Sequence, residues 1–275
     1  MAPLPRLLAA GAATAGLGTA FVAGAVVESR AYLLRRVDVP VLPPRARPLR
    51  VLHLSDLHLT PWQRREPAFI RSLAALEPDL VVDTGDNLAH PAAVPSVLSA
   101  LQPLLERPGV FVLGSNDYFA PKPKNPARYL LPRDGRRVIG RRLPTSDLVR
   151  GLTDAGWLDL DNARGVLDVG GLRLRFTGVD DPHLGYDRHP ADDGAGEGAD
   201  LHVGVLHAPY TRVLDALTVD GATLLLAGHT HGGQAAGAGL RRAGHQLRPR
   251  PPSRPRPQPV VAGCRHRVAA RGRTA

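Results

Sequence analysis

Between residues 49 and 114, short apolar runs alternate with amphipathic stretches of helix length. The runs at 49–55, 79–85 and 109–114 predict strands, whereas 67–78 and 95–105 place apolar residues at helical spacing. The pattern resumes after residue 144, with helices predicted at 147–155 and 210–217 and strands at 165–169, 172–178, 201–206 and 222–227. Because the strands are almost continuously apolar, we expect sheets that are covered on both faces.

Changes in composition divide the chain into four segments. Residues 1–36 form an apolar N-terminal segment, and residues 37–48 are a proline-punctuated linker that cannot be helical. Residues 49–234 carry the alternating pattern and are predicted to form one α/β domain, within which the acidic, glycine-rich stretch 191–200 predicts a solvated loop. Residues 235–275 are rich in Arg and Pro, and no strand pattern is evident there.

The N-terminal segment contains 21 uncharged residues from Leu7 to Val27, which is the length of a helix that crosses a bilayer. We predict a single-pass anchor in the cell membrane. The small residues Ala23, Gly24 and Ala25 also fit the end of a cleaved signal peptide, after which the protein would be exported, and a buried helix is a third reading. More Arg residues follow the span than precede it, which favours a cytoplasmic domain.

The net charge of +10 lies almost wholly in the C-terminal tail. Residues 241–275 hold ten Arg and no Lys, Asp or Glu, so residues 1–240 are formally neutral. We therefore expect no specific nucleic-acid partner for the domain. The tail itself has three interpretations, namely binding to anionic lipid or nucleic acid, disorder, or a shifted reading frame in GC-rich DNA. The single cysteine, Cys264, excludes an intrachain disulfide, so metal ligands must be His, Asp, Glu or Asn.

Several predicted strands end in a loop that carries residues able to bind a metal. These residues are Asp56, His58, Asp86, His207, His229 and His231. In an open α/β sheet the carboxyl ends of the strands form the edge where ligands bind. Each residue alone also fits a turn or a helix cap. Together, six such residues at successive strand ends predict a metal site built from imidazole and carboxylate groups.

These motifs closely resemble the calcineurin-like metallophosphoesterase family, whose pattern is Asp-x-His, Gly-Asp, Gly-Asn-His-Asp, a single His and Gly-His-x-His. The resemblance covers about residues 49–234, and four of the five motifs are intact. It implies two divalent metal ions, Mn, Fe or Zn, with Asp86 bridging them. One ion would be held by Asp56, His58 and His231, and the other by His207 and His229.

The resemblance also implies a reaction and a fold. A metal-bridging hydroxide would attack the phosphoester, with no protein nucleophile required. The fold would be a four-layer α/β/β/α sandwich, which the alternation of strands and helices permits. Because no strand pattern follows Gln234, we expect this sandwich to lack its C-terminal strands.

One motif departs from the family, because this chain has Gly114-Ser115-Asn116-Asp117 where the family has Gly-Asn-His-Asp. Ser115 thus replaces the Asn that ligates the second metal, and Asn116 replaces the His that contacts phosphate and assists the leaving group. We expect Asn116 to reach the metal through a small shift of the loop. Asp117 would orient Asn116 or a neighbouring His, so both are candidate catalytic residues.

Three further residues are candidates for binding substrate, namely Asn87 beside Asp86, and Asp181 and His183 in the segment TGVDDPHLG. That segment and the N-terminal linker resemble a membrane-associated bacterial branch of the family, some members of which act on phosphorylated lipids or envelope compounds. We therefore predict a hydrolase for a phosphoester substrate at the membrane. The alternatives are a catalytically impaired metal-binding module and a binding protein that acts through its basic tail.

Overall fold

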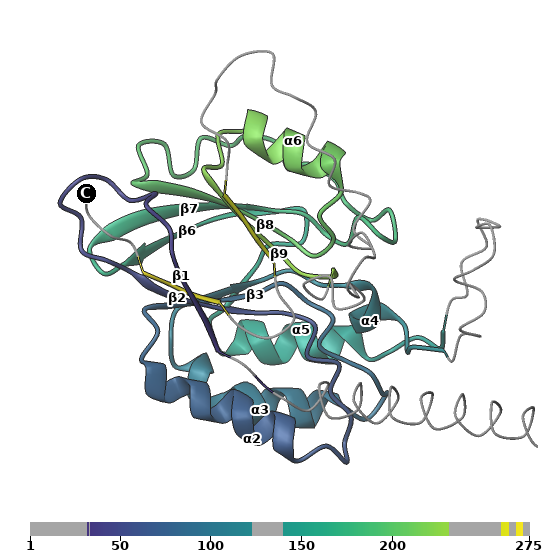
Figure 1. Cartoon of the computed structure of the whole chain (residues 1–275). Helices are drawn as coiled ribbons and strands as arrows, with labels where there is room; N and C mark the ends of the chain where they lie inside the picture. The colour runs from purple at the N-terminus through teal and green to yellow at the C-terminus, as the bar shows by residue number, and fades with distance from the viewer. Residues whose placement is uncertain (1–31, 33, 123–139, 231–259, 264–267, 272–275) are drawn as a thin grey trace, which may run out of the picture. The chain divides into compact units, whose positions relative to one another are not determined.

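The computed structural model describes residues 32, 34–122, 140–230, 260–263 and 268–271 of the chain (Figure 1). The predicted membrane segment at 7–27 lies outside these residues. Within the described part of the chain, no helix combines the length and the apolar character needed to cross a membrane. The described elements form two β-sheets with helices on their outer faces.

The first sheet has six strands in the order β1-β11-β2-β3-β4-β5. Strands β2, β3, β4 and β5 pair in parallel, as expected for strands that alternate with helices, whereas β11 is antiparallel to β2. Their bounds are Arg35–Asp38 for β1, Arg50–Leu54 for β2, Leu80–Asp83 for β3, Gly109–Phe111 for β4, Leu158–Asp159 for β5 and Val268–Arg271 for β11. The predicted linker therefore begins inside β1.

The second sheet has five strands in the order β10-β9-β8-β7-β6. Strands β7, β8, β9 and β10 are parallel, and β6 forms an antiparallel hairpin with β7. Their bounds are Arg164–Val169 for β6, Leu172–Gly178 for β7, Leu201–Leu206 for β8, Leu224–Ala227 for β9 and Val260–Gly263 for β10. The parallel strands end at one edge, which is where the candidate ligands follow.

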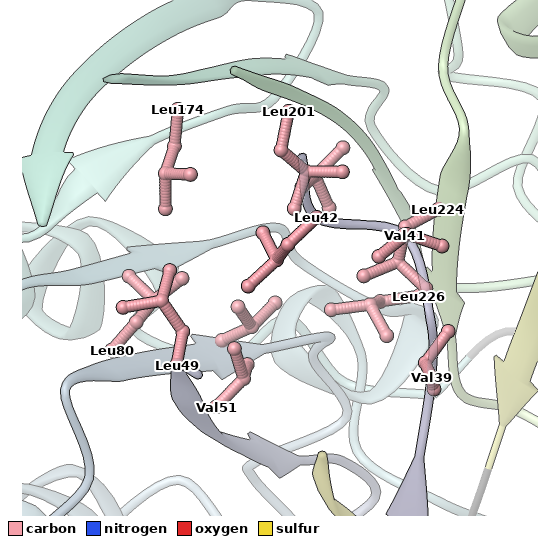
Figure 2. Close-up of a pocket in the computed structure, with 12 residues that line it drawn as sticks. Val39, Val41, Leu42, Leu49, Val51, Leu80, Leu174, Leu201, Leu224 and Leu226 are labelled. Carbon is pink, nitrogen blue, oxygen red and sulfur yellow. The ribbon is translucent and has the colours of Figure 1, made fainter. Parts of the chain in front are cut away.

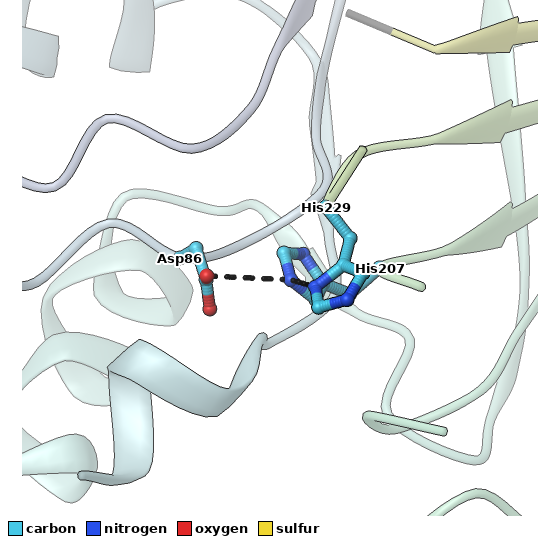
Figure 3. A group of neighbouring side chains, drawn as sticks. All are labelled: Asp86, His207 and His229. Carbon is cyan, nitrogen blue, oxygen red and sulfur yellow. Dashed lines mark hydrogen bonds and ion pairs between the residues drawn. The ribbon is translucent and has the colours of Figure 1, made fainter. Parts of the chain in front are cut away.

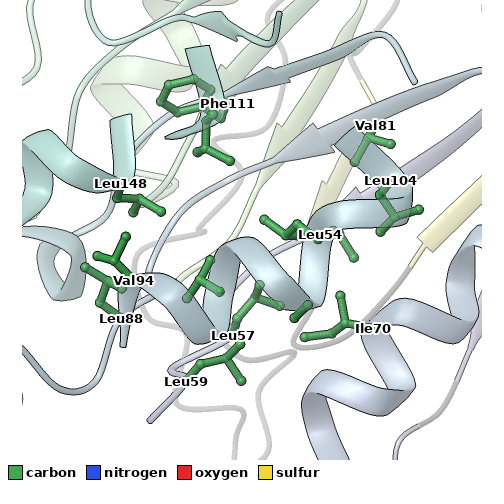
Figure 4. Close-up of a cluster of buried hydrophobic side chains, with 14 of the residues drawn as sticks. Leu54, Leu57, Leu59, Ile70, Val81, Leu88, Val94, Leu104, Phe111 and Leu148 are labelled. Carbon is green, nitrogen blue, oxygen red and sulfur yellow. The ribbon is translucent and has the colours of Figure 1, made fainter. Parts of the chain in front are cut away.

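The helices cover the outer faces of the two sheets. The six-stranded sheet is covered by α2 (Arg65–Ser72), its 3₁₀ extension η1 (Leu73–Leu76), α3 (Val94–Leu105) and α5 (Thr145–Asp154). Buried side chains such as Leu54, Leu104 and Phe111 fill this layer (Figure 4). The five-stranded sheet is covered by α6 (Thr211–Val219), which packs Leu214 and Leu217 against it. The four-layer α/β/β/α fold predicted from the sequence is confirmed.

The layer between the sheets consists almost entirely of aliphatic side chains, including Val82, Leu174 and Leu226. It contains a cavity of about 30 Å³ lined by Val and Leu residues alone (Figure 2). An apolar cavity offers water no hydrogen-bond partners, so we expect it to be dry. The inter-sheet core is therefore less tightly filled than the layer beneath the helices.

The expectation that the sandwich lacks its C-terminal strands is wrong. Strand β10 extends the five-stranded sheet beside β9, and β11 lies between β1 and β2 in the six-stranded sheet. Each of these strands is only four residues long; β10 follows Pro259, and β11 follows Arg267. A run of that length is too short for its periodicity to predict a strand.

Candidate metal centre

The carboxyl ends of strands from both sheets bring the candidate ligands together. Asp56 and His58 follow β2, Asp86 follows β3, His207 follows β8, and His229 follows β9. They form two donor groups, Asp56–His58–Asp86 and Asp86–His207–His229, in each of which the ligand atoms lie within 4.8 Å of one another. Asp86 belongs to both groups, so the two groups share one carboxylate. His231 lies outside the described residues.

The backbone of these loops is strained at the ligand positions. Seven described residues other than glycine have a positive φ angle, and four of them are candidate ligands, namely Asp56, His58, Asp86 and His229. Left-handed backbone at a non-glycine residue costs about 1–3 kcal/mol and is concentrated at functional sites. The fold maintains this strain because the left-handed turns direct the ligand side chains to one point.

Glycines make room for the ligands at three places. Gly85 has a φ of +83°, which allows the tight turn that precedes Asp86. A Cβ at Gly114 would overlap Asp86 Oδ1 and approach His207 Cε1, at 2.8 Å. A Cβ at Gly228 would overlap Ser55 Oγ. These backbone segments therefore lie directly against the ligand side chains.

Asp86, His207 and His229 form one donor group, in which Asp86 and His207 are buried (Figure 3). His207 Nε2 lies 3.4 Å from Asp86 Oδ2 and 3.3 Å from His229 Nδ1. The other ring nitrogen of His207, Nδ1, lies 2.7 Å from the Thr84 carbonyl oxygen. Since a carbonyl oxygen only accepts, Nδ1 carries a proton, and it is Nε2 that has a lone pair for a metal when the ring is neutral.

The electrostatics of this group suit metal binding. Burial would raise the pKa of Asp86, but the attraction of His207 and His58 outweighs it and holds the pKa well below its usual range. Burial would lower the pKa of His207, but Asp86 outweighs it and raises the pKa well above 6.5. Burial, together with the positive charge of His207 and His183, lowers the pKa of His229 to about 4. Ionised carboxylate and neutral imidazole are the forms that bind metals, so Asp86 and His229 are in the binding form, whereas His207 would release a proton when it binds an ion.

Asp56 and His58 form the second group together with Asp86. His58 Nε2 lies 3.9 Å from Asp56 Oδ1 and 3.8 Å from Asp86 Oδ2. Asp56 Oδ2 accepts hydrogen bonds from Ser55 Oγ at 2.7 Å and from the backbone N–H of His229 at 3.0 Å. The bond from His229 connects the two sheets at the site, so the relative position of the two donor groups is fixed.

Asn116 lies at the centre, in the short helix α4 (Ser115–Tyr118) that follows β4. Its backbone N–H donates to Asp86 Oδ1 at 2.7 Å, and its Nδ2 donates to Asp86 Oδ2 at 2.9 Å. Nδ2 also lies 3.5 Å from His58 Nδ1. Ligation of a metal by Asn116 stays a prediction.

Asp117 is fully buried, and its carboxylate holds the loops that carry the ligands. Oδ2 accepts from the backbone N–H groups of Asp86 and Gly114, at 2.8 and 2.9 Å. Oδ1 accepts from those of Asn87 and Leu88, at 2.8 and 3.2 Å. Burial and the charge of Asp86 raise the pKa of Asp117 to about 8, although the Gly114 and Asn87 hydrogen bonds oppose this rise. Asp117 thus contacts backbone amides, and an orienting effect on Asn116 would act through them.

The three candidate substrate-binding residues differ in their burial. Asn87 is fully buried, and among the described residues its side-chain amide makes no hydrogen bond of normal geometry. Burial raises the pKa of the neighbouring Asp83 carboxyl to about 6, and the Asn87 amide opposes this rise. Asp181 is also fully buried, and burial raises its pKa to about 6. Only His183 is partly exposed, with its ring centroid 4.8 Å from that of His229. Of the three, His183 is the best placed to contact a substrate.

No role for Tyr210 was predicted from the sequence, yet its hydroxyl oxygen lies 3.2 Å from His183 Nδ1. Tyr210 immediately precedes α6 and follows His207 by three residues. A tyrosine before a helix is common and carries no chemical signature. Its proximity in sequence to a candidate ligand is the one signal that could have drawn attention to it.

The donor set fits a pair of divalent metal ions. It offers carboxylate oxygens and imidazole nitrogens, one carboxylate is shared, and the glycine backbone leaves room where side chains would otherwise intrude. Such mixed nitrogen and oxygen donors suit Mn, Fe or Zn, whereas Mg and Ca prefer oxygen alone. Two ions in one site of this kind are typical of enzymes that cleave phosphate esters.

Comparison with known proteins gives matches over the part of the chain that carries the candidate ligands. The sequence profile of the calcineurin-like phosphoesterases matches residues 49–233. A Bos taurus protein described as "Transmembrane protein with metallophosphoesterase domain" is 30% identical over 221 residues, which is 78% of this chain and 47% of that protein. The chain thus spans about half the length of this relative.

Solved structures also match at low sequence identity. The NAD nucleotidase of Haemophilus influenzae is 15% identical with a TM-score of 0.42, and the match covers 67% of this chain and 38% of that one. The 5'-nucleotidase of Candida albicans is 13% identical with a TM-score of 0.38, and the match covers 70% of this chain and 43% of that one.

Proposed function

Because the chain belongs to the calcineurin-like phosphoesterase family, we propose that it is a dinuclear metal-dependent hydrolase of phosphoester bonds. The observation that carries this proposal is the sharing of Asp86 between two donor groups. Divalent ions held there would activate water and neutralise the charge of the phosphoryl oxygens. We propose His231, which the family motif implies as a ligand, as a further ligand of the Asp56–His58–Asp86 group.

The residues of the chain bind and orient the reacting groups. His207 presents Nε2 to the centre because Thr84 holds its other nitrogen, and this bond also fixes the plane of the ring. Asn116 donates two hydrogen bonds to Asp86, which fix both oxygens of the bridging carboxylate. Asp117 holds the backbone of both loops in place from beneath. His183 lies at the partly exposed side of the centre and would contact the substrate.

We propose that the substrate is a phosphorylated compound of the membrane or cell envelope. The support is the 21-residue uncharged segment at 7–27 and the word "transmembrane" in the description of the Bos taurus relative. An N-terminal anchor would keep the site within reach of lipid headgroups. The segments at 1–36, 37–48 and 235–275 would then serve as anchor, linker and tail around the domain at 49–234.

A catalytically impaired metal-binding module is the second candidate, and Asn116 favours it. Asn116 occupies the position of the family's histidine, and an amide cannot deliver a proton to a leaving group. Its two hydrogen bonds to Asp86 instead give it a part in holding the bridging carboxylate. Such a module would bind metal tightly and turn over aryl phosphates very slowly.

The test is turnover of p-nitrophenyl phosphate by the full-length chain in detergent, first stripped of metal and then supplied with Mn, Fe or Zn. We expect turnover only with metal, and a loss of at least 100-fold in kcat for His207→Ala. His90→Ala, which changes another histidine four residues after Asp86, is the matched control and should keep wild-type turnover. Metal binding by the wild type without turnover would select the impaired module. Turnover unaffected by chelation would refute both candidates.

A further inference from the structure

Trp62 is the most exposed of the tryptophan, tyrosine and phenylalanine side chains in the described part of the chain, with 68% of it open to solvent. It lies in the loop that follows β2, four residues after His58. Its ring makes an edge contact with the ring of His90, at 5.0 Å between centroids, and most of the indole stays uncovered. The loop that carries two candidate ligands therefore also presents a large, mainly apolar area that another surface can cover.

Hydrogen bonds fix the turn that carries Trp62. Gln63 Oε1 accepts from the Thr60 backbone N–H at 2.5 Å and from its hydroxyl at 3.1 Å. Gln63 Nε2 donates to Glu66 Oε2 at 3.0 Å, which ties the turn to α2. Just before the turn, the Leu59 backbone N–H donates to a carbonyl oxygen of the loop after β3 at 2.8 Å. Trp62 is thus held on a fixed turn whose position follows that of the metal centre.

The helix that follows this turn, α2, has a basic outer face. Its one acidic residue, Glu66, is buried, and its exposed residues are Arg65, Ala68, Arg71 and Ser72, with the exposed Arg64 just before the helix. None of the three Arg side chains forms an ion pair within the part of the chain that the structure describes. Because a helix N-terminus carries a partial positive charge, Arg64 and Arg65 lie where cations destabilise the helix. Such a local conflict is expected where the charge serves a partner.

The chain enters the domain on the side that α2 covers (Figure 1). Leu34 packs against the apolar cluster beneath α2 and α3, and it follows Val27, the end of the predicted anchor, by only seven residues. Seven extended residues span at most about 25 Å. An anchor at 7–27 would therefore keep this side of the domain close to a bilayer.

We infer that Trp62 and the basic face of α2, formed by Arg64, Arg65 and Arg71, dock the domain on an anionic lipid bilayer. Indole rings favour the headgroup level of a membrane, where one part of the ring is apolar and the N–H stays hydrated. Arg side chains beside it would be attracted by the negative charge of the lipids. This inference rests on the proposed function, since docking there would bring the metal centre to the surface that carries the substrate.

The test uses the full-length chain in vesicles of phosphatidylcholine brominated on its acyl chains, with or without an equal amount of phosphatidylglycerol. Bromine quenches an indole that enters the membrane. The chain has two tryptophans, so quenching that is present in the wild type and absent in Trp62→Phe reports Trp62. The charge is tested by the double variant Arg64→Gln/Arg65→Gln. Its matched control is Arg107→Gln/Arg173→Gln, which removes two exposed Arg residues at the amino ends of β4 and β7, away from the ligands.

We expect the emission of Trp62 to be quenched in vesicles that contain phosphatidylglycerol, and much less in phosphatidylcholine alone or at high salt, which screens the charges. Each Arg near an anionic surface strengthens binding about 5-fold. The equilibrium constant for docking, obtained from the quenched fraction as phosphatidylglycerol is increased, should therefore fall about 10- to 30-fold in Arg64→Gln/Arg65→Gln. The control double variant should dock as the wild type does.

Equal docking by the two double variants would overturn the inference, as would Trp62 emission that no brominated vesicle quenches. A larger response of Trp62 emission to duplex DNA than to anionic vesicles would also overturn it, because the basic face would then bind nucleic acid.

The failure of the proposed function looks different, and it is detected by turnover of p-nitrophenyl phosphate in the same vesicles. A wild type that docks through Trp62 but hydrolyses no phosphoester would refute the hydrolase and support the docking surface. An active wild type whose Trp62 is not quenched would do the reverse.

Discussion

Replacing Asp117 by Asn should destabilise the fold and the metal centre together. The Asp117 carboxylate accepts four backbone N–H groups, two at each oxygen, from the loops that follow β3 and β4. In asparagine one of the two oxygens becomes an NH₂ group, which cannot accept. Two buried N–H groups would then face another donor, because the side chain is completely buried.

The expected loss follows from those two hydrogen bonds. Above about pH 8 the Asp117 carboxyl is ionised, so the unfolding is measured at about pH 9. A hydrogen bond to a charged group contributes about 1.5–3 kcal/mol, so two of them amount to about 3–6 kcal/mol. Domains are typically stable by about 5–15 kcal/mol, which makes this a large fraction of the total. The loss of position in the Asp86 backbone should also weaken metal binding.

The assay is urea unfolding of the metal-free chain, followed by the fluorescence of Trp157, which is buried. The control is Asp147→Asn, where a side chain that is 57% exposed pairs with Arg150 at the surface. Exposed pairs contribute about 0–1 kcal/mol, so the control should be nearly neutral. If Asp117→Asn lies within 1 kcal/mol of the control, the account of how this carboxylate holds the loops is wrong.

Three further outcomes are expected. Val82→Ile should add a methylene group to the inter-sheet cavity and stabilise the fold by up to about 0.8 kcal/mol in urea unfolding. Val81→Ile is the control, because Val81 lies on the packed face beneath the helices, and it should destabilise the fold by about 1–3 kcal/mol. Burial would raise the pKa of Asp220, but its hydrogen bonds with Arg164 outweigh this and hold the pKa at about 2. The native state then binds fewer protons than the unfolded state, so this stabilisation is complete above about pH 4. It falls by about 2 kcal/mol as the pH falls toward 2. Asp220→Asn should lack that dependence, and an equal acid dependence of the unfolding free energy in both proteins would contradict the assignment. Gly114→Ala should lower metal affinity at least 10-fold in a calorimetric titration, because its Cβ would overlap Asp86 Oδ1, and unchanged affinity would show that the backbone does not lie so close.

The sequence predicted most of the fold because its strands are long, apolar runs. The strands at 172–178 and 201–206 have the same bounds in the structure, and the helix predicted at 95–105 begins only one residue earlier. The C-terminal strands β10 and β11 were missed because four residues within an Arg-rich segment carry too little pattern. Their pairing is decided by the neighbouring strands, which are distant in sequence.

The site was predictable as far as residue type and strand position determine it. Asp86 and His207 lie 121 positions apart, and the rule that ligands gather at carboxyl strand ends was enough to place them together. The contact between His183 and Tyr210 was not predictable, because it depends on how one loop folds against the start of α6. The burial of Asn87 could not be anticipated either, since a polar residue beside a candidate ligand normally suggests exposure.

The count of metal ions bound per chain, measured by native mass spectrometry, tests the central claim most directly. If Asp86 bridges two donor groups, the wild type binds two ions, and Asp86→Asn binds neither of them tightly. His58→Ala and His229→Ala, which each change one group, should each retain one ion. An Asp86→Asn variant that binds the same number of ions as the wild type would contradict the shared centre on which this account is built.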